Sequence, residues 1–210
     1  MIFKDRSDAG KKLAEKLIEY KGEDVALYAL PRGGIEVAAP IAQKLGVSLD
    51  LIIARKVGHP LQPEFGIAAV SEGGHLVSNP EMIETVDSEW FADEVARQQE
   101  VAKEERQKYL SGLQIVSAEN KVAILVDDGV ATGLTLMAAI QDLLNQKPAK
   151  TVVAVPVAPQ DTANKLQEMV NELVVLEIPE EFAGAVGSYY ENFQQVSDDK
   201  VVKLLNEVNK

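Results

Sequence analysis

Two adjacent carboxylates, Asp127 and Asp128, lie between a run of apolar residues and a turn rich in small and hydroxyl-bearing residues. The apolar run (VAILV) spans residues 122–126, and the turn continues over residues 129–135 as GVATGLT. An unbroken Val/Ile/Leu run predicts a strand that is buried on both faces, as in a parallel sheet. Apolar residues then recur with helical spacing over residues 134–145, so the turn should join this strand to a helix.

The turn is suited to binding an anion, because its backbone N–H groups and the N-terminus of the next helix would point to one place. Asp127 and Asp128 would repel a phosphate placed beside them. The two features agree if the ligand carries both a phosphate and neutral hydroxyls, or brings a divalent cation; a phosphorylated ribose meets these demands. The alternative is an ordinary turn in which Asp and Thr only cap a helix.

The stretch 122–135 (VAILVDDGVATGLT) closely resembles the motif with which type I phosphoribosyltransferases bind phosphoribosyl pyrophosphate (PRPP). The resemblance implies that Asp127 and Asp128 contact the ribose hydroxyls and that the turn binds the 5-phosphate. The turn residues that it assigns to the substrate are Gly129, Val130, Ala131, Thr132, Gly133, Leu134 and Thr135. A Walker A loop is excluded, because Leu134 stands where that loop needs lysine.

A second candidate anion site consists of Arg32, Gly33 and Gly34, which follow another expected strand. The glycines permit close approach of a ligand to the backbone, and the arginine fork suits phosphate oxygens. Alone, this triplet is also typical of a plain turn. Beside the first motif it resembles the pyrophosphate loop of the family, which often contains a strained or cis peptide bond. The resemblance places such a bond near residues 31–33.

Arg55 and Lys56 end the next expected strand, and alternation would send their side chains to opposite sides. The resemblance implies that a basic residue here meets the pyrophosphate leaving group, and a solvated strand end is the alternative. The turn formers of residues 58–77 predict a mobile loop followed by a hairpin. By resemblance this segment is a flexible lid. Within it, Glu64 is a better candidate for proton transfer than His59, because a lone loop histidine is more often solvated.

Ala131 departs from the hypoxanthine–guanine branch of the family, in which the matching residue is an aspartate that handles the purine's proton. This departure argues against a 6-oxopurine acceptor and leaves the general base unassigned. The resemblance implies transfer of 5-phosphoribose from PRPP to a nitrogenous, nucleobase-like acceptor with release of pyrophosphate, and Mg²⁺ bound mainly through PRPP. The alternative is a PRPP-sensing regulatory protein with the same fold and little or no transferase activity.

Two segments extend the expected core. Residues 79–112 predict a helical insertion, in which Val95, Ala102 and Tyr109 fall at heptad spacing. This stripe indicates either a solvated helix that docks along one side or a partner contact such as a homodimer interface. Residues 179–210 are expected to form a small hood and a C-terminal helix. The hood's clustered aromatics, among them our base-binding candidate Tyr189, form either a stacking face for a planar base or a satellite core.

Alternating strand and helix patterns predict a doubly wound α/β fold with a mainly parallel sheet, within a single phosphoribosyltransferase domain over residues 1–210. The expected strands are residues 25–30, 49–56, 122–128, 151–157 and 173–178, and the expected helices are residues 4–20, 35–45, 134–145 and 160–170. Ligands of such sheets bind at the carboxyl ends of the strands, which is where both motifs fall.

Composition narrows the class of protein. The 210 residues include 21 Lys and Arg against 33 Asp and Glu, a net charge of −12, which argues against non-specific binding to nucleic acid or to a membrane surface. The absence of cysteine excludes disulfides and thiolate catalysis. The N-terminus lacks the apolar core of a signal peptide, and no apolar run is long enough to span a bilayer, so we expect a cytoplasmic protein.

Overall fold

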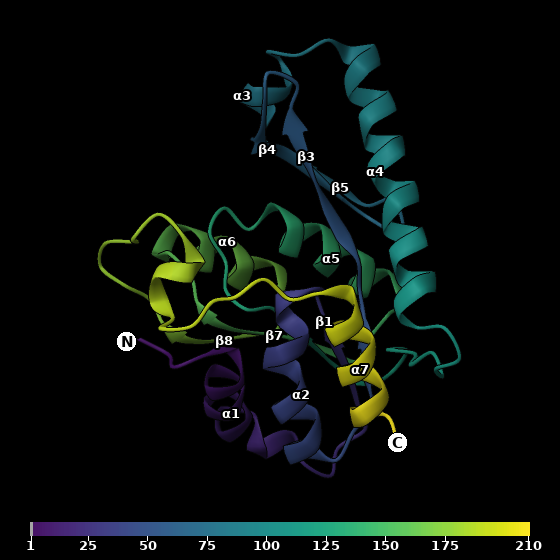
Figure 1. Ribbon diagram of the computed structural model, residues 1–210, viewed down its shortest axis with the longest axis vertical. Coiled ribbons are helices and arrows are strands. Elements are labelled where there is room, and N and C mark those ends of the chain that lie inside the picture. Colours follow the sequence, from purple (N-terminus) through teal and green to yellow (C-terminus); the bar gives the residue numbers. More distant parts are fainter. Residues whose placement is uncertain (1) are drawn as a thin grey trace.

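The computed structural model, which describes residues 2–210, is built around a five-stranded parallel sheet with helices on both faces (Figure 1). The strands lie side by side in the order β2-β1-β6-β7-β8. Their bounds are Leu49–Leu51 for β2, Val25–Ala29 for β1, Val122–Val126 for β6, Lys150–Val157 for β7 and Glu172–Glu177 for β8. The doubly wound, mainly parallel α/β fold predicted from the sequence is confirmed.

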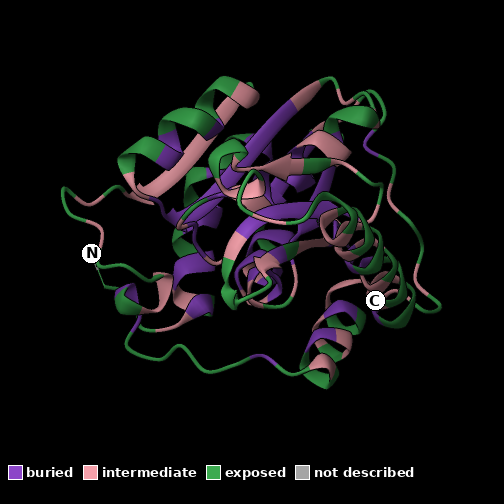
Figure 2. Ribbon diagram, turned by 90° about the horizontal axis from the view of Figure 1, so that it is seen from above, coloured by how far each residue is buried: buried purple, intermediate pink, exposed green. Residues whose placement is uncertain are grey.

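Side chains that alternate along the strands divide the core into two layers. In β1, Leu27 faces one layer, whereas Ala26 and Tyr28 face the other. The first layer is covered by α1 (Arg6–Lys16), α2 (Gly33–Leu45) and α7 (Asp198–Val208), and the second by α5 (Leu134–Asn145) and α6 (Gln160–Met169). Figure 2 shows the buried residues concentrated on the central strands and on the inward faces of these helices.

The second helix differs from its expected form. We expected residues 35–45, with a kink or a late start at Pro40, but α2 begins earlier, at Gly33, and continues through the proline. The helix packs closely on α1, because a Cβ atom at Gly10 would lie only 2.3 Å from the carbonyl oxygen of Val37. This close packing holds the start of α2, and with it the Arg32-Gly33-Gly34 turn, in a fixed place.

A separate antiparallel sheet, with strands in the order β3-β4-β5, extends from the body (Figure 1). Its strands are β3 (Ala54–His59), β4 (Gln62–Ser71) and β5 (Leu76–Ser78), and it is followed by α3 (Pro80–Ile83) and α4 (Ser88–Tyr109). We call residues 54–109 the arm.

The arm corrects two sequence-based expectations. The single strand expected over residues 49–56 is wrong, because the chain leaves the parallel sheet after β2 and starts β3 in the other sheet. The loop expected at the start of residues 58–77 is also wrong: β3 and β4 are paired up to His59 and Gln62, which leaves only a tight turn. Proline and glycine in this segment are compatible with edge strands and bulges, and the β3–β4 register does shift next to Gly58.

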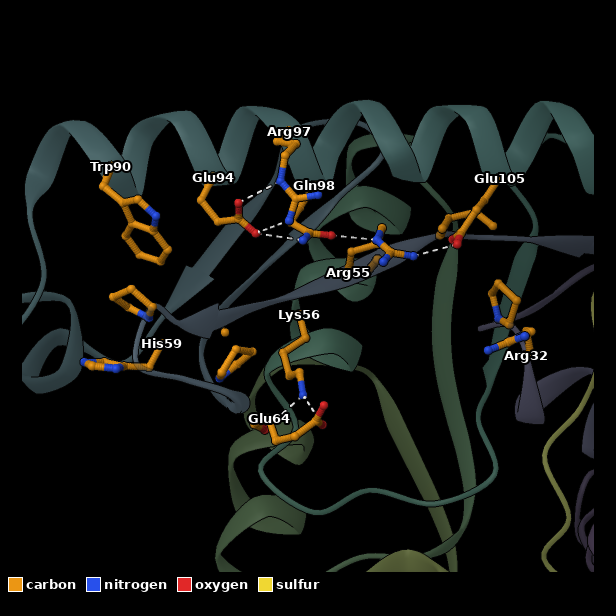
Figure 3. A pocket seen from close by; sticks show the side chains of 16 residues that line it. Arg32, Arg55, Lys56, His59, Glu64, Trp90, Glu94, Arg97, Gln98 and Glu105 are labelled. Atoms are coloured by element: carbon orange, nitrogen blue, oxygen red, sulfur yellow. Dashed lines mark hydrogen bonds and ion pairs between the residues drawn. The ribbon is translucent and has the colours of Figure 1, made fainter.

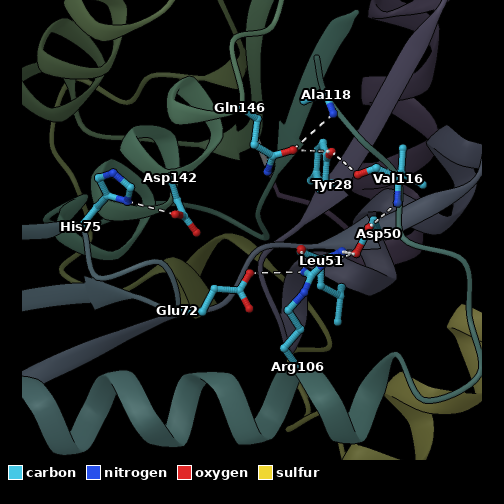
Figure 4. Close-up of polar contacts among 10 residues, drawn as sticks. All are labelled: Tyr28, Asp50, Leu51, Glu72, His75, Arg106, Val116, Ala118, Asp142 and Gln146. Carbon is cyan, nitrogen blue, oxygen red and sulfur yellow. Dashed lines mark hydrogen bonds and ion pairs between the residues drawn. The ribbon is translucent and has the colours of Figure 1, made fainter.

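The arm is fastened to the body by Arg106 of α4 (Figure 4). Its guanidinium donates to the carbonyl oxygen of Leu51 and contacts Asp50 Oδ1 at 3.1 Å and Glu72 Oε1 at 3.3 Å. Asp50 is almost fully buried, so the ion pair lies inside the junction between arm and body. This polar cluster therefore joins α4 to the end of β2 and to β4.

The heptad stripe of α4 packs within the chain. Ala102 and Tyr109 are buried against the body, and Val95 packs against the small sheet of the arm. These contacts agree with the interpretation of α4 as a helix that docks along one side.

The hood pairs with the N-terminal segment of the chain. After β8, a short 3₁₀ helix (Val186–Tyr189) leads to Tyr190, which forms a parallel bridge with Phe3. Glu191 N–H donates to the carbonyl oxygen of Phe3 over 2.8 Å, so the N-terminal segment runs beside the hood. Within residues 2–210, none of the helices is both long and apolar enough to cross a membrane.

Candidate functional site

The two motifs found in the sequence lie side by side, because β1 and β6 are neighbouring parallel strands with Ala29 opposite Val126. A Cβ atom at Gly33 would lie 1.8 Å from Asp128 Oδ2, and one at Gly34 would lie 2.9 Å from the carbonyl oxygen of Val126. Only glycine fits such an approach at both positions. The peptide bond between Pro31 and Arg32 is cis, within the expected residues 31–33.

The turn after Asp128 is held in place by hydrogen bonds to its backbone. Val130 N–H donates to the carbonyl oxygen of Val157 over 2.9 Å, and the Thr162 hydroxyl donates to the carbonyl oxygen of Ala131 over 2.7 Å. Gly133, with a φ of 81°, is the N-cap of α5, and no side chain caps this helix. The first N–H groups of an uncapped helix have no partner inside the helix, so the turn offers donors and a positive dipole end to an anion.

The two acids lie in different surroundings. Asp127 Oδ1 accepts a hydrogen bond from the backbone N–H of Asp128 over 2.8 Å. Burial, followed by the neighbouring charge of Asp128, raises the pKa of Asp127 well above its usual range. Burial also raises the pKa of Asp128, although Arg6 acts in the opposite direction. Both carboxylates are therefore costly to keep charged without a cation or hydroxyl donors nearby.

Sequence reasoning missed Arg6. Its Nε donates to Asp128 Oδ2 over 2.6 Å, from a position 122 residues away in the chain. No local spacing or motif relates two residues at this separation. Only the fold, which packs α1 beside α2 below the carboxyl edge of the sheet, brings them together.

A hollow of about 620 Å³ between the β3–β4 hairpin, α4 and the turn after β1 is lined by several of the predicted residues (Figure 3). Arg32, Arg55, Lys56 and Glu64 all line it, together with His59. The structure thus brings together side chains from the second motif, from β3 and from the β3–β4 hairpin.

Arg55 and Lys56 point to opposite sides of β3, as alternation predicted. Arg55 is fixed to α4, where its Nε donates to Gln98 Oε1 over 2.7 Å and its Nη1 to Glu105 Oε1 over 2.6 Å. Lys56 Nζ instead contacts the carbonyl oxygen of Glu64 at 2.9 Å and Glu64 Oε2 at 3.1 Å. Of the two, Lys56 is the more exposed and the more easily redirected toward an incoming anion.

Arg32, at the other end of the hollow, lies 3.4 Å from Asp198 Oδ1 of α7. Both side chains are well exposed, and the same carboxylate accepts hydrogen bonds from Tyr109 and Lys108. Exposed ion pairs of this kind contribute only about 0–1 kcal/mol, so a phosphate could replace Asp198 as the partner of Arg32.

A second hollow, of about 610 Å³, lies on the other side of the hairpin. It is bordered by Ala131, Thr132 and Leu134 of the turn and by Phe65 and Gly66 of β4. Asp127 and Asp128 line neither hollow. Apart from Tyr189, the predicted residues therefore fall into three groups: one at each hollow, and the acids and glycines at the strand ends of the body.

Tyr189 lies in a small aromatic cluster rather than beside either hollow. It is almost fully buried, its hydroxyl accepts from Ala183 N–H over 2.9 Å, and its ring is stacked on Phe182 with 5.4 Å between centroids. The cluster includes Phe3 of the N-terminal segment, so Tyr189 lies in a satellite core, the second of the two alternatives that the sequence left open. A neighbouring hood residue, Val186, would meet a Cβ atom at Gly129 at 2.5 Å, so the hood supports the start of the turn.

No group of three or more His, Asp or Glu side chains among residues 2–210 is arranged to hold a metal ion.

Comparison with known proteins identifies the family. The phosphoribosyl transferase domain family matches residues 3–193. A predicted phosphoribosyl transferase of Mycobacterium tuberculosis H37Rv is 37% identical over 211 residues, covering 100% of this chain and 47% of that protein. The corresponding protein of strain CDC 1551 gives the same values, so the chain spans about half the length of the curated relatives it matches.

Two solved structures have a similar fold. The protein TT1426 from Thermus thermophilus is 40% identical, with a TM-score of 0.82 and 100% of both chains covered. A purine phosphoribosyltransferase from Pyrococcus horikoshii is similar in fold, with a TM-score of 0.50, 18% identity, and 93% of this chain and 97% of that chain covered. The chain therefore belongs to the phosphoribosyltransferase family, with the fold of its type I members.

Proposed function

We propose that the protein transfers 5-phosphoribose from PRPP to a nitrogenous, nucleobase-like acceptor and releases pyrophosphate. The observation that carries this proposal is the contact between the two loops, in which Gly33 and Gly34 leave room for Asp127 and Asp128 beside the uncapped N-terminus of α5. One edge of the sheet then offers two anion-binding turns with hydroxyl-binding acids between them. A donor with a phosphate at one end, a pyrophosphate at the other and a ribose between them fits this order.

In this proposal the turn 129–135 binds the 5-phosphate through backbone N–H groups and the hydroxyls of Thr132 and Thr135. The ribose hydroxyls donate to Asp127 and Asp128, whose buried carboxylates gain the hydrogen bonds that they need. The pyrophosphate contacts Arg32 and the backbone of Gly33 and Gly34. The N-terminus of α2, which has no side-chain cap, supports this last assignment.

During transfer the bond between ribose C1 and the pyrophosphate oxygen breaks, and a nitrogen of the acceptor forms the new bond to C1. Its electron pair comes from the acceptor, and the bonding pair leaves with pyrophosphate. Arg32 and Lys56 would stabilise the growing negative charge once the site is closed, because cations act most strongly on developing charge where water is excluded. Bound Mg²⁺, carried mainly by PRPP oxygens, would offset part of the same charge.

Two segments of the arm have proposed roles in this reaction. Residues 58–77, which include the turn of the β3–β4 hairpin, would close as a lid that keeps water from the activated ribose. Glu64, fully exposed and paired with Lys56, is the proposed proton acceptor for the attacking nitrogen once the lid is closed. Arg55 is held by Gln98 and Glu105 as a fixed positive charge in the wall.

To identify the acceptor, the protein is incubated with Mg-PRPP and a panel of nucleobases while released pyrophosphate is measured. Base-dependent release is expected. Tight PRPP binding without turnover on any acceptor would favour a PRPP-sensing regulator instead.

The donor site is tested with the double variant Asp127→Asn with Asp128→Asn, which should stay folded and lose PRPP binding in calorimetry. Asp93→Asn, an exposed acid on α4, is the matched control and should bind PRPP as the wild type does. Unchanged PRPP affinity in the double variant would refute the proposed donor site.

A further inference from the structure

Three segments that are far apart in the sequence meet at Asp128. Arg6 of α1 contacts its carboxylate at 2.6 Å, and the hydroxyl of Tyr190 in the hood donates to its carbonyl oxygen over 2.6 Å. Gly33 leaves the space that this arrangement needs, because a Cβ atom there would also lie 2.9 Å from Arg6 Nε. Asp128 is therefore held by contacts from outside its own loop, its side chain by Arg6 and its backbone by Tyr190.

Arg6 is itself held firmly. It is only 6% exposed, its Nη1 donates to the carbonyl oxygen of Gln194 over 2.7 Å, and its guanidinium lies 3.8 Å from the ring centroid of Phe193. Each of these contacts comes from the hood. An arginine fixed on several sides in this way presents its Nε in one direction, toward Asp128.

The pairing with Asp128 is closer than the one other ion pair of Arg6 within residues 2–210. Arg6 Nη1 lies 3.5 Å from Glu36 Oε2, whereas Arg6 Nε lies 2.6 Å from Asp128 Oδ2. Glu36 also has Lys200 as a partner. Asp128 therefore depends on Arg6 for its ion pair, whereas Glu36 has Lys200 as a second cationic partner.

We propose that Arg6 is a positioning residue that holds the Asp128 carboxylate in the orientation in which it accepts hydrogen bonds from the ribose hydroxyls of PRPP; this inference rests on the proposed function. A carboxylate has about four acceptor positions, and the single N–H from Arg6 leaves the others for ligand hydroxyls. A buried arginine can instead serve only to join α1 to the hood. The two roles differ in whether the effect of Arg6 on PRPP depends on Asp128.

A double-mutant cycle separates the roles. PRPP affinity is measured by calorimetry with Mg²⁺ present for the wild type, Arg6→Met, Asp128→Asn and the double variant. If Arg6 acts through Asp128, each single change weakens PRPP binding on the order of tenfold, and the double variant binds no more weakly than Asp128→Asn alone. Lys12→Met, which removes an exposed lysine from the same helix, is the control and should bind like the wild type.

A conservative variant covers the case in which Arg6→Met fails to fold. Arg6→Lys keeps the positive charge but not the planar fork, and should bind PRPP with intermediate affinity. With a turnover assay, both variants should raise KM for PRPP more than they lower kcat, because the hydroxyl contacts exist before and during the reaction.

The outcomes are distinct. Additive losses in the cycle, or PRPP affinity unchanged in Arg6→Met and Arg6→Lys, would overturn the role of Arg6 and leave the proposed function intact. Failure of the wild type to bind PRPP would overturn the proposed function, and this inference with it.

Discussion

At the scale of single residues, the candidate site needs a glycine at position 33 as much as it needs its charged side chains. Gly33 lies so near Asp128 that no larger residue fits without moving the acid or Arg6. Any such movement would change the contact between the Asp128 carboxylate and Arg6. The two turns that we propose to bind anions can face one ligand only while this contact remains close.

Gly33→Ala should therefore destabilise the fold and weaken PRPP binding together. Overpacking a tight site costs about 1–3 kcal/mol, and here the clash falls on a buried carboxylate rather than on a flexible side chain. The measurements are denaturant unfolding and PRPP calorimetry. Gly66→Ala is the control for stability, because its Cβ atom would meet only the flexible stem of Lys56 at 3.0 Å. Equal stability losses in the two variants would contradict the prediction.

The buried carboxyl group of Glu72 should make the stability of the fold depend on pH. Burial raises the pKa of Glu72 to about 7 from 4.5, and Oε2 has no hydrogen-bond partner among residues 2–210. An acid whose pKa is higher in the folded state contributes stability that is present below pH 4.5 and is lost as the pH rises through about 7.

Glu72→Gln should remove this loss. Relative to the wild type, the variant should gain unfolding free energy between pH 5 and pH 8, by up to about 3 kcal/mol at 1.36 kcal/mol per pKa unit. Urea unfolding at several pH values measures the difference. Glu15→Gln, at an exposed ion pair with Lys44, should show no such trend. A pH-independent difference for Glu72→Gln would show that the carboxyl titrates normally.

Much of the residue-level interpretation could be made from the sequence because the two motifs are local. Asp127 and Asp128 follow β6 directly, and Gly33 and Gly34 come after the short turn that ends β1, so recognising the strands placed all four at one edge. Arg6 could not be found in this way, since its pairing is a product of tertiary packing. Clustering of aromatics in the sequence also could not decide between a base-stacking face and the satellite core in which Tyr189 lies.

At the scale of elements, the sequence located the strands of the body well and the arm poorly. Residues 49–56 form a single β-prone run in the sequence. Ile52 and Ile53, which lie between β2 and β3, are buried and apolar like the strand residues, so the sequence shows no break there. Periodicity reports whether a segment is extended, not which sheet it joins. The turn formers of residues 58–64 likewise suggested a loop, although pairing with a neighbouring strand outweighs weak local preference.

Arg106→Met tests how the arm is fixed to the body. Removing this guanidinium would leave Asp50 buried without its cation, and breaking a buried pair costs about 3–5 kcal/mol. Hydrogen exchange should rise first in α4 and β3–β5, ahead of the five-stranded sheet. Arg97→Met, which removes another arginine of α4 whose partner Glu94 lies on the same helix, should leave exchange in the arm unchanged. Uniform loss of protection across the chain would argue against a separate anchoring role.

At the scale of the whole molecule, the fold closes on itself where its N-terminal segment meets the hood. Phe3 is fully buried, its ring lies 5.4 Å from that of Tyr190, and its backbone pairs with residues 189 and 191. At Arg6, three residues after Phe3, the same segment enters α1, and Arg6 contacts Asp128. The position of the hood and the orientation of a site acid are thus coupled through one short stretch of chain.

Phe3→Ala should loosen this closure. Truncating a buried phenylalanine typically costs about 3–5 kcal/mol, and the loss here falls on the aromatic cluster that holds the hood. Hydrogen exchange should therefore increase over residues 182–194 and at the start of α1, and PRPP affinity should fall because Arg6 is no longer held against Asp128. Ile2→Ala is the matched control, since that side chain is 64% exposed and should be replaceable without effect. If Phe3→Ala loosens the hood while PRPP affinity stays at the wild-type value, the hood and the donor site are independent and the proposed coupling between them is wrong.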